Sequence, residues 1–276
     1  MHMIQMLGLV TVVYFLALAL IALNRDNINV RVGNCIFVVV DIILYGFWMY
    51  GAHIQGSKLD IFMMLGNVSP LTCIIFAATP LLSDKIKDMA YSMIAFLHLG
   101  IFAAMYISPE HAYLFNFNEQ ATPMYTGEAL CHAVCSMFGI YLILTRQVKP
   151  CFESWIKSIK FLFTIIFCGV IFNFIFHERL FGMDPYGNYS IYMIDIFGSF
   201  GATLLAYLLG VLLVLTVGMQ SGKLLDRVFS HGKAVEPESP SEIIADDAAE
   251  ELSAPTECTE GSDDGENDDP PVISEE

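Results

Sequence analysis

The fold is decided first by residues 4–23, which read IQMLGLVTVVYFLALALIAL and contain no charged side chain. An α-helix rises about 1.5 Å per residue, so roughly 20 apolar residues cross a hydrocarbon core about 30 Å thick. Further stretches of the same character follow, separated by polar or turn-forming residues. The sequence therefore predicts seven transmembrane helices, at 4–23, 35–53, 60–82, 89–107, 125–145, 159–176 and 190–217.

Composition supports a membrane protein. Hydrophobic residues make up 55% of the chain and charged residues only 15%, with a mean hydropathy of +0.59, whereas soluble domains are about one quarter charged. Lipid cannot satisfy exposed backbone groups, and no stretch alternates as a barrel strand does, so the spans must be helical. We expect an all-α, polytopic helix bundle.

The distribution of basic residues predicts its orientation. Of the 13 Lys and Arg residues, only Lys58 and Arg179 follow an even-numbered span, and the others follow or flank odd-numbered spans. Cytoplasmic loops carry an excess of Lys and Arg. The sequence thus predicts a multi-pass protein of the cell membrane, with an external N-terminus and a cytoplasmic C-terminus.

The net charge of −16 lies entirely at the C-terminal end, because residues 234–276 contain many Asp and Glu but no Lys, Arg or aromatic residue. Such a segment has too little apolar surface to fold. We therefore divide the chain into a seven-helix transmembrane domain, 1–230, and a disordered acidic cytoplasmic tail, 231–276. The tail either solvates the protein or recruits a protein partner. The transmembrane domain has no basic face, which excludes nucleic-acid binding.

Small residues recur every four positions along the last predicted span, at Gly198, Ala202, Ala206 and Gly210. A stripe of this kind allows two membrane helices to approach closely. We interpret it as a packing surface.

Polar side chains inside a membrane are costly and usually face the interior of the bundle, so each is a candidate for function. Counting the helical rise from the predicted external ends places several of them in the outer half of the bundle. The sequence predicts a polar pocket that opens outward and involves Asn67, Glu128, Asn173, Asp195 and His98. Asp41 falls in the inner half.

On the fifth predicted span, Glu128, Cys131, His132 and Cys135 follow i, i+3, i+4, i+7 spacing and share one face. A Glu one turn from a His can orient the ring and raise its basicity, as a general base requires. The same pair could equally be a buried hydrogen bond that only joins helices. The Cys-His-x-x-Cys spacing lacks a second pair of ligands, so we predict no metal site and no cofactor. We also predict no structural disulfide.

The order of motifs over residues 60–217 resembles the YwaF-like integral membrane family, which occurs in bacteria and is related to an animal transmembrane lipid acyltransferase. The resemblance rests on Ser69-Pro70-Leu71-Thr72-Cys73, on residues 88–91 through 107–110, on His132, and on Phe172-Asn173-Phe174, Asn188-Tyr189 and Asp195 near Gly198. In the acyltransferase branch a Cys on the third helix and a His on the fifth carry the reaction, and a similar family of lipid ester hydrolases uses Thr with His. The resemblance implies Thr72 or Cys73 as nucleophile, His132 as base and a membrane lipid as substrate.

Three functions remain open at this level. The first is a lipid acyl hydrolase or transacylase. The second is a small-solute or proton-coupled transporter in which Glu128, His132, Asn173 and Asp195 line the path, although the two halves of the chain show no repeat. The third is a non-catalytic sensor or scaffold whose acidic tail recruits a partner.

Overall fold

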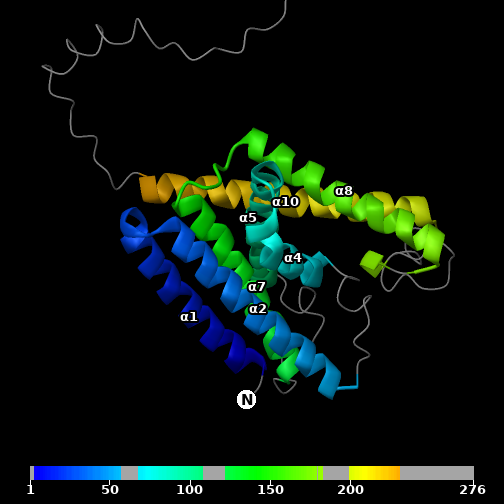
Figure 1. Cartoon of the computed structure of the whole chain (residues 1–276), viewed down its shortest axis with the longest axis horizontal. Coiled ribbons are helices and arrows are strands. Elements are labelled where there is room, and N and C mark those ends of the chain that lie inside the picture. The colour runs from blue at the N-terminus through cyan, green and yellow to red at the C-terminus, as the bar shows by residue number, and fades with distance from the viewer. Residues whose placement is uncertain (1–2, 57–67, 108–121, 179, 183–198, 231–276) are drawn as a thin grey trace, which may run out of the picture. The chain divides into compact units, whose positions relative to one another are not determined.

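The computed structural model describes residues 3–56, 68–107, 122–178, 180–182 and 199–230 (Figure 1). These residues form helices and contain no strand, which confirms the all-α fold. The α-helices are α1 (Met3–Asn24), α2 (Val30–Ile54), α4 (Val68–Ala78), α5 (Asp84–Ile107), α7 (Pro123–Leu144), α8 (Phe152–Phe176) and α10 (Phe200–Ser230). Short 3₁₀ turns lie at η1 (Arg25–Asn27), η2 (Thr79–Leu81) and η3 (Leu180–Gly182).

Six of the described helices are long and apolar enough to cross a membrane: α1, α2, α5, α7, α8 and α10. The outer faces of α1, α2, α8 and α10 expose large apolar side chains, including Leu16, Ile43, Phe167 and Leu213, each more than half exposed. So much apolar surface would be unfavourable in water, whereas lipid chains would cover it. The third predicted span is described only from Val68, where α4 and η2 form a shorter apolar segment.

The helix ends differ from the predicted spans at the charged borders. Helix α8 begins at Phe152 rather than at residue 159, so the charged residues before the apolar span are also helical. There Lys157 Nζ contacts Glu153 Oε1 at 2.7 Å and Asp88 Oδ2 of α5 at 2.9 Å. Helix α10 likewise continues to Ser230, beyond the apolar limit at residue 217.

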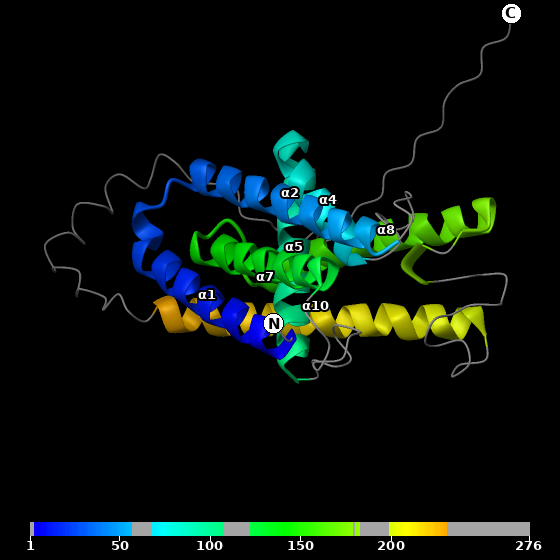
Figure 2. The ribbon, with the colours of Figure 1, turned by 90° about the horizontal axis from the view of Figure 1, so that it is seen from below.

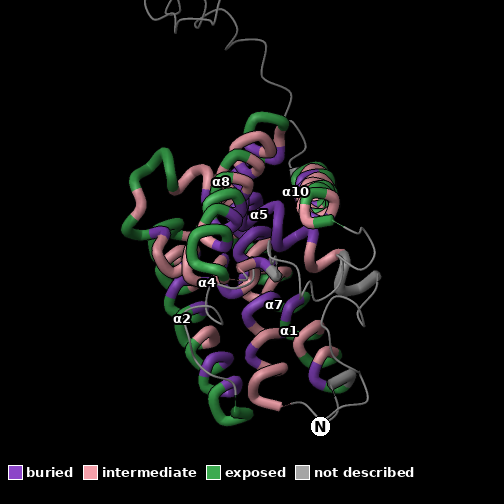
Figure 3. The backbone as a smooth tube through the Cα atoms, turned by 90° about the vertical axis from the view of Figure 1, so that its right-hand side faces the viewer, coloured by how far each residue is buried: buried purple, intermediate pink, exposed green. Residues whose placement is uncertain are grey.

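Helices α5 and α7 form the interior of the bundle (Figure 3). Helix α7 packs against α1, α2 and α5, and α5 packs against α7, α8 and α10. Figure 2 shows α5 crossing α7 and α10 steeply rather than running alongside them. Segments from both ends of the described chain therefore meet around α5 and α7.

The predicted small-residue stripe is not where α10 approaches another helix most closely. A methyl group added to Gly210 would meet no atom within 4 Å, so the interpretation of Gly210 as a packing position is wrong. The close approach lies two turns later, where Gly218 faces the backbone of Phe96 on α5. Gly198 lies outside the described residues.

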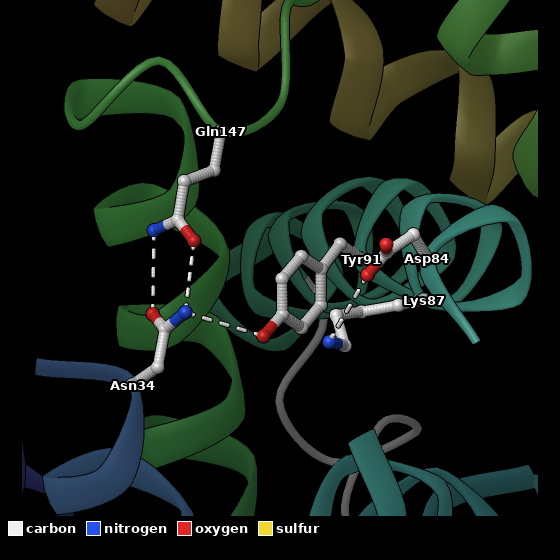
Figure 4. A network of polar contacts seen from close by, with 5 residues as sticks. All are labelled: Asn34, Asp84, Lys87, Tyr91 and Gln147. Atoms are coloured by element: carbon white, nitrogen blue, oxygen red, sulfur yellow. Dashed lines mark hydrogen bonds and ion pairs between the residues drawn. The ribbon is translucent and has the colours of Figure 1, made fainter. Parts of the chain in front are cut away.

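A polar network joins helix ends that the charge distribution assigns to the cytoplasmic side (Figure 4). Asn34 at the start of α2 donates to Gln147 Oε1 at 2.9 Å and to Tyr91 Oη at 3.2 Å, and Gln147 Nε2 donates back to Asn34 Oδ1 at 3.3 Å. Asp84 and Lys87, in the first turn of α5, form an ion pair at 3.6 Å. The meeting of these helix ends agrees with the predicted alternation of spans.

Candidate functional site

Three helices bring a carboxyl group and two thiols together inside the bundle. Asp41 comes from α2, Cys73 from α4 and Cys135 from α7, and all three side chains are buried. The Cys135 thiol donates to Asp41 Oδ1 at 3.6 Å, and the sulfurs of Cys73 and Cys135 lie 4.0 Å apart. One ligand atom from each of the three residues lies within 4.8 Å of the other two.

Small residues position this cluster by allowing close contact between α2 and α7. Gly127 of α7 lies against the backbone of Trp48, and Gly51 of α2 lies against the backbone at Met124. Since α2 and α7 approach without side chains between them at these points, polar groups elsewhere on their facing surfaces can come into hydrogen-bonding range. Helix α4 packs against α2, α5 and α7 and adds Cys73.

Two imidazoles lie next to the thiols. His98 on α5 and His132 on α7 are 1% and 7% exposed, and their ring centroids are 6.0 Å apart. The Cys73 thiol lies within electrostatic range of both rings. Neither ring nitrogen of His98 has a hydrogen-bond partner among the described residues. The sequence predicts His132 in the interior near Asn67, Asn173 or Asp195. His132 is buried and lies next to His98, whereas Asn67 and Asp195 lie outside the described residues.

The structure distinguishes the two candidate nucleophiles. The Thr72 hydroxyl donates to the carbonyl oxygens of Val68 and Ser69 in its own helix, the latter at 3.0 Å. Such back-bonding satisfies a threonine hydroxyl within the helix. Thr72 is thus held within α4, whereas Cys73 lies among the thiols, the carboxyl group and the imidazoles.

The predicted pocket is only partly brought together. His98 joins His132, and half-buried Glu128 lies within electrostatic range of Cys131. Asn173 instead binds the backbone of Leu180: its side-chain N–H donates to the Leu180 carbonyl at 3.0 Å, and its side-chain oxygen accepts from the Leu180 N–H at 2.8 Å. Asn67 and Asp195 lie outside the described residues.

We expect Asn173→Ala to lower the free energy of unfolding by about 1–3 kcal/mol, because both backbone groups of Leu180 would lose their partner. The matched control is Asn24→Ala, since Asn24 is exposed and, among the described residues, its side chain donates to Leu20 of its own helix. It should change stability by less than about 0.5 kcal/mol. Thermal unfolding of the detergent-solubilised protein measures both, and equal effects would contradict the assigned role of Asn173.

The sequence did not single out the carboxyl group and the second thiol of this cluster. The sequence makes Asp41 a candidate as an ionisable residue within a span but predicts it in the inner half, outside the pocket, and it indicates Cys135 only by its place on the His132 face. A separate surface cleft of about 340 Å³ is lined by Ile143, Arg146, Val148, Lys149, Pro150 and Asp226. None of these six residues belongs to the predicted pocket.

Comparisons of the chain with protein-family models, with curated proteins and with solved structures found no match. The assignment of function therefore depends on the geometry of the cluster.

Proposed function

We propose that this chain is a multi-pass protein of the cell membrane, with its acidic tail in the cytoplasm, that transfers or hydrolyses acyl groups of membrane lipids. Cys73 would be the nucleophile and an imidazole from His132 or His98 the base. The observation that carries this proposal is a buried thiol within electrostatic range of two buried imidazoles, in a bundle with lipid-facing sides.

Cys73 suits this role better than Thr72 for two reasons. The Thr72 hydroxyl already donates to its own helix, and a thiol is more readily ionised and intrinsically more nucleophilic than a hydroxyl. An imidazole next to a thiol can accept its proton as the attack proceeds. Neighbouring Cys135 donates to Asp41 and so does not need Cys73 as an acceptor.

The proposed reaction has two steps. The Cys73 sulfur attacks the ester carbonyl of a lipid, its proton passes to the imidazole, and the alcohol portion of the lipid leaves with that proton. This forms a thioester on Cys73. An acceptor alcohol or water then attacks the thioester, loses its proton to the imidazole, and the thiol is restored when the proton returns to sulfur.

The test is to incubate the purified protein with a phospholipid carrying a labelled acyl chain and to look for a hydroxylamine-sensitive acyl group. We expect label on wild type, located at Cys73 by mass spectrometry, and none on Cys73→Ala. Cys168→Ala is the matched control, because Cys168 is an exposed cysteine of α8. It should be acylated as wild type is.

His132→Ala should lower the rate of acylation by about 100-fold or more, which is the usual contribution of a general base. Acylation that persists unchanged in Cys73→Ala would overturn the assignment of the nucleophile. Acylation of wild type at any other residue would overturn it as well.

One observation favours a second function, proton-coupled transport. Asp41 is fully buried within α2, and no described Lys or Arg forms an ion pair with it. Carboxyl groups in such places often carry protons in transporters. Under this alternative Asp41→Asn would abolish uptake in a vesicle assay, while Cys73→Ala would retain it.

A further inference from the structure

We infer that Asp41, Cys73 and Cys135 form a binding site for a zinc ion, to which the buried His98 can add a fourth ligand if its ring moves toward the ion. This inference shares Cys73 with the proposed acyl transfer, but it is tested separately, because its test measures binding rather than turnover. It also reverses the expectation of no metal site, which considered only the spacing of residues within one helix.

The distances between the ligand atoms fit tetrahedral zinc. Zinc–sulfur bonds of about 2.3 Å and zinc–oxygen bonds of about 2.0–2.2 Å, at tetrahedral angles, place two sulfurs about 3.8 Å apart and a sulfur and an oxygen about 3.6 Å apart. The Cys73 and Cys135 sulfurs are 4.0 Å apart, and Cys135 Sγ and Asp41 Oδ1 are 3.6 Å apart. All three ligand atoms lie within 4.8 Å of one another. An ion at their centre would require little movement.

An independent observation points to a ligand at the same place. His98 is 1% exposed, and neither of its ring nitrogens has a hydrogen-bond partner among the described residues. Asp41 Oδ2 is buried and also lacks such a partner. Leaving a buried polar atom unsatisfied costs about 1–3 kcal/mol. A metal ion at the cluster would satisfy Asp41 Oδ2 directly. It would satisfy His98 after a movement of the ring, because His98 is not among the residues whose ligand atoms all lie within 4.8 Å of one another.

Charge favours a divalent ion over a monovalent one. Two thiolates and one carboxylate carry three negative charges, which Zn²⁺ reduces to one and Cu⁺ only to two. Residual charge is costly in a membrane interior. Binding displaces the two thiol protons, which leave to solvent.

The two thiols are also close enough to suggest an alternative, a redox disulfide. Disulfide formation would require the two sulfurs to move from 4.0 Å apart to about 2.0 Å. It would involve neither Asp41 nor His98 and would leave their unsatisfied atoms unexplained. The zinc site accounts for the three clustered side chains and, once its ring moves, for His98.

The experiment uses the full chain, purified in detergent with reductant, stripped with a chelator and then titrated with Zn²⁺ or with Cd²⁺ as an optical probe. For wild type we expect about one ion per chain, ultraviolet cadmium–thiolate absorption and release of protons into weak buffer. Cys73→Ser and Cys135→Ser should each weaken binding by more than about 100-fold, since even outer partners of a metal ligand contribute about 10–100-fold. Cys168→Ser, at an exposed position on α8, should bind as wild type does.

Wild type alone also tests the inference, in case the variants fail to fold. Zn²⁺ should slow alkylation of Cys73 and Cys135 while leaving the alkylation rate of Cys168 unchanged. Folded, reduced wild type that binds no more Cd²⁺ than the Cys73→Ser/Cys135→Ser double variant would overturn the inference. So would isolation of a Cys73–Cys135 disulfide together with an absence of binding after reduction. Binding by wild type without lipid acylation would leave the zinc site standing and reject the proposed acyl transfer.

Discussion

Replacing Gly218 with alanine is expected to lower the free energy of unfolding by about 3 kcal/mol or more and to separate α10 from α5. A methyl group at Gly218 would overlap the carbonyl oxygen of Phe96, which is a backbone atom of the facing helix. A flexible side chain could turn away, but a backbone can move only if the helix moves. Overpacking of this kind typically costs about 1–3 kcal/mol, and we place Gly218 at the upper end because two backbones are involved.

The matched control is Gly210→Ala on the same helix, where the added methyl group would meet no atom within 4 Å. Alanine has a higher helix propensity than glycine, so this change should be neutral or should stabilise the protein by up to about 1 kcal/mol. Size-exclusion chromatography and thermal unfolding in detergent measure the pair. If Gly210→Ala destabilised the protein as much as Gly218→Ala does, the assigned contact between α5 and α10 would be wrong.

This pair also illustrates which part of the fold the sequence can predict. Apolar length predicted the helices, because each must satisfy its backbone within lipid. The faces by which helices meet could not be predicted in the same way, since every face of such a helix is apolar and small residues occur on several of them. Gly210 and Gly218 look alike in the sequence, and only the steep crossing of α5 over α10 distinguishes them (Figure 2).

The candidate site shows the same division. His132 was predicted because an imidazole is costly in lipid, and it does lie inside the bundle next to His98. Asp41 and Cys135 were not paired, because 94 residues separate them and no local spacing predicts their contact. Thr72 and Cys73 are neighbours in sequence and equally plausible there. The structure distinguishes them, because the Thr72 hydroxyl donates hydrogen bonds to the backbone of its own helix and the Cys73 thiol lies beside Cys135.

The second large effect that we expect is a gain in stability. His98→Leu should raise the free energy of unfolding of the metal-free protein by about 1–2 kcal/mol. Both ring nitrogens of His98 are buried without a described hydrogen-bond partner, and each unsatisfied buried group costs about 1–3 kcal/mol. Leucine removes that cost and keeps most of the packed volume. A histidine that served only to hold the helices together would give the opposite sign.

The same variant should lose the stabilisation that zinc provides. A ligand that binds only the folded protein stabilises it by RT ln(1 + [L]/Kd), which is about 2.7 kcal/mol at 100 times Kd. Wild type should therefore melt at a lower temperature than His98→Leu in chelator and at a higher temperature than His98→Leu in zinc. His53→Leu is the control, because His53 is exposed on α2 and should shift neither value by more than about 0.5 kcal/mol. If His98→Leu lowered the stability of the protein in chelator, the His98 nitrogens would have partners after all. If zinc raised the melting temperature of His98→Leu as much as that of wild type, His98 would not be a ligand.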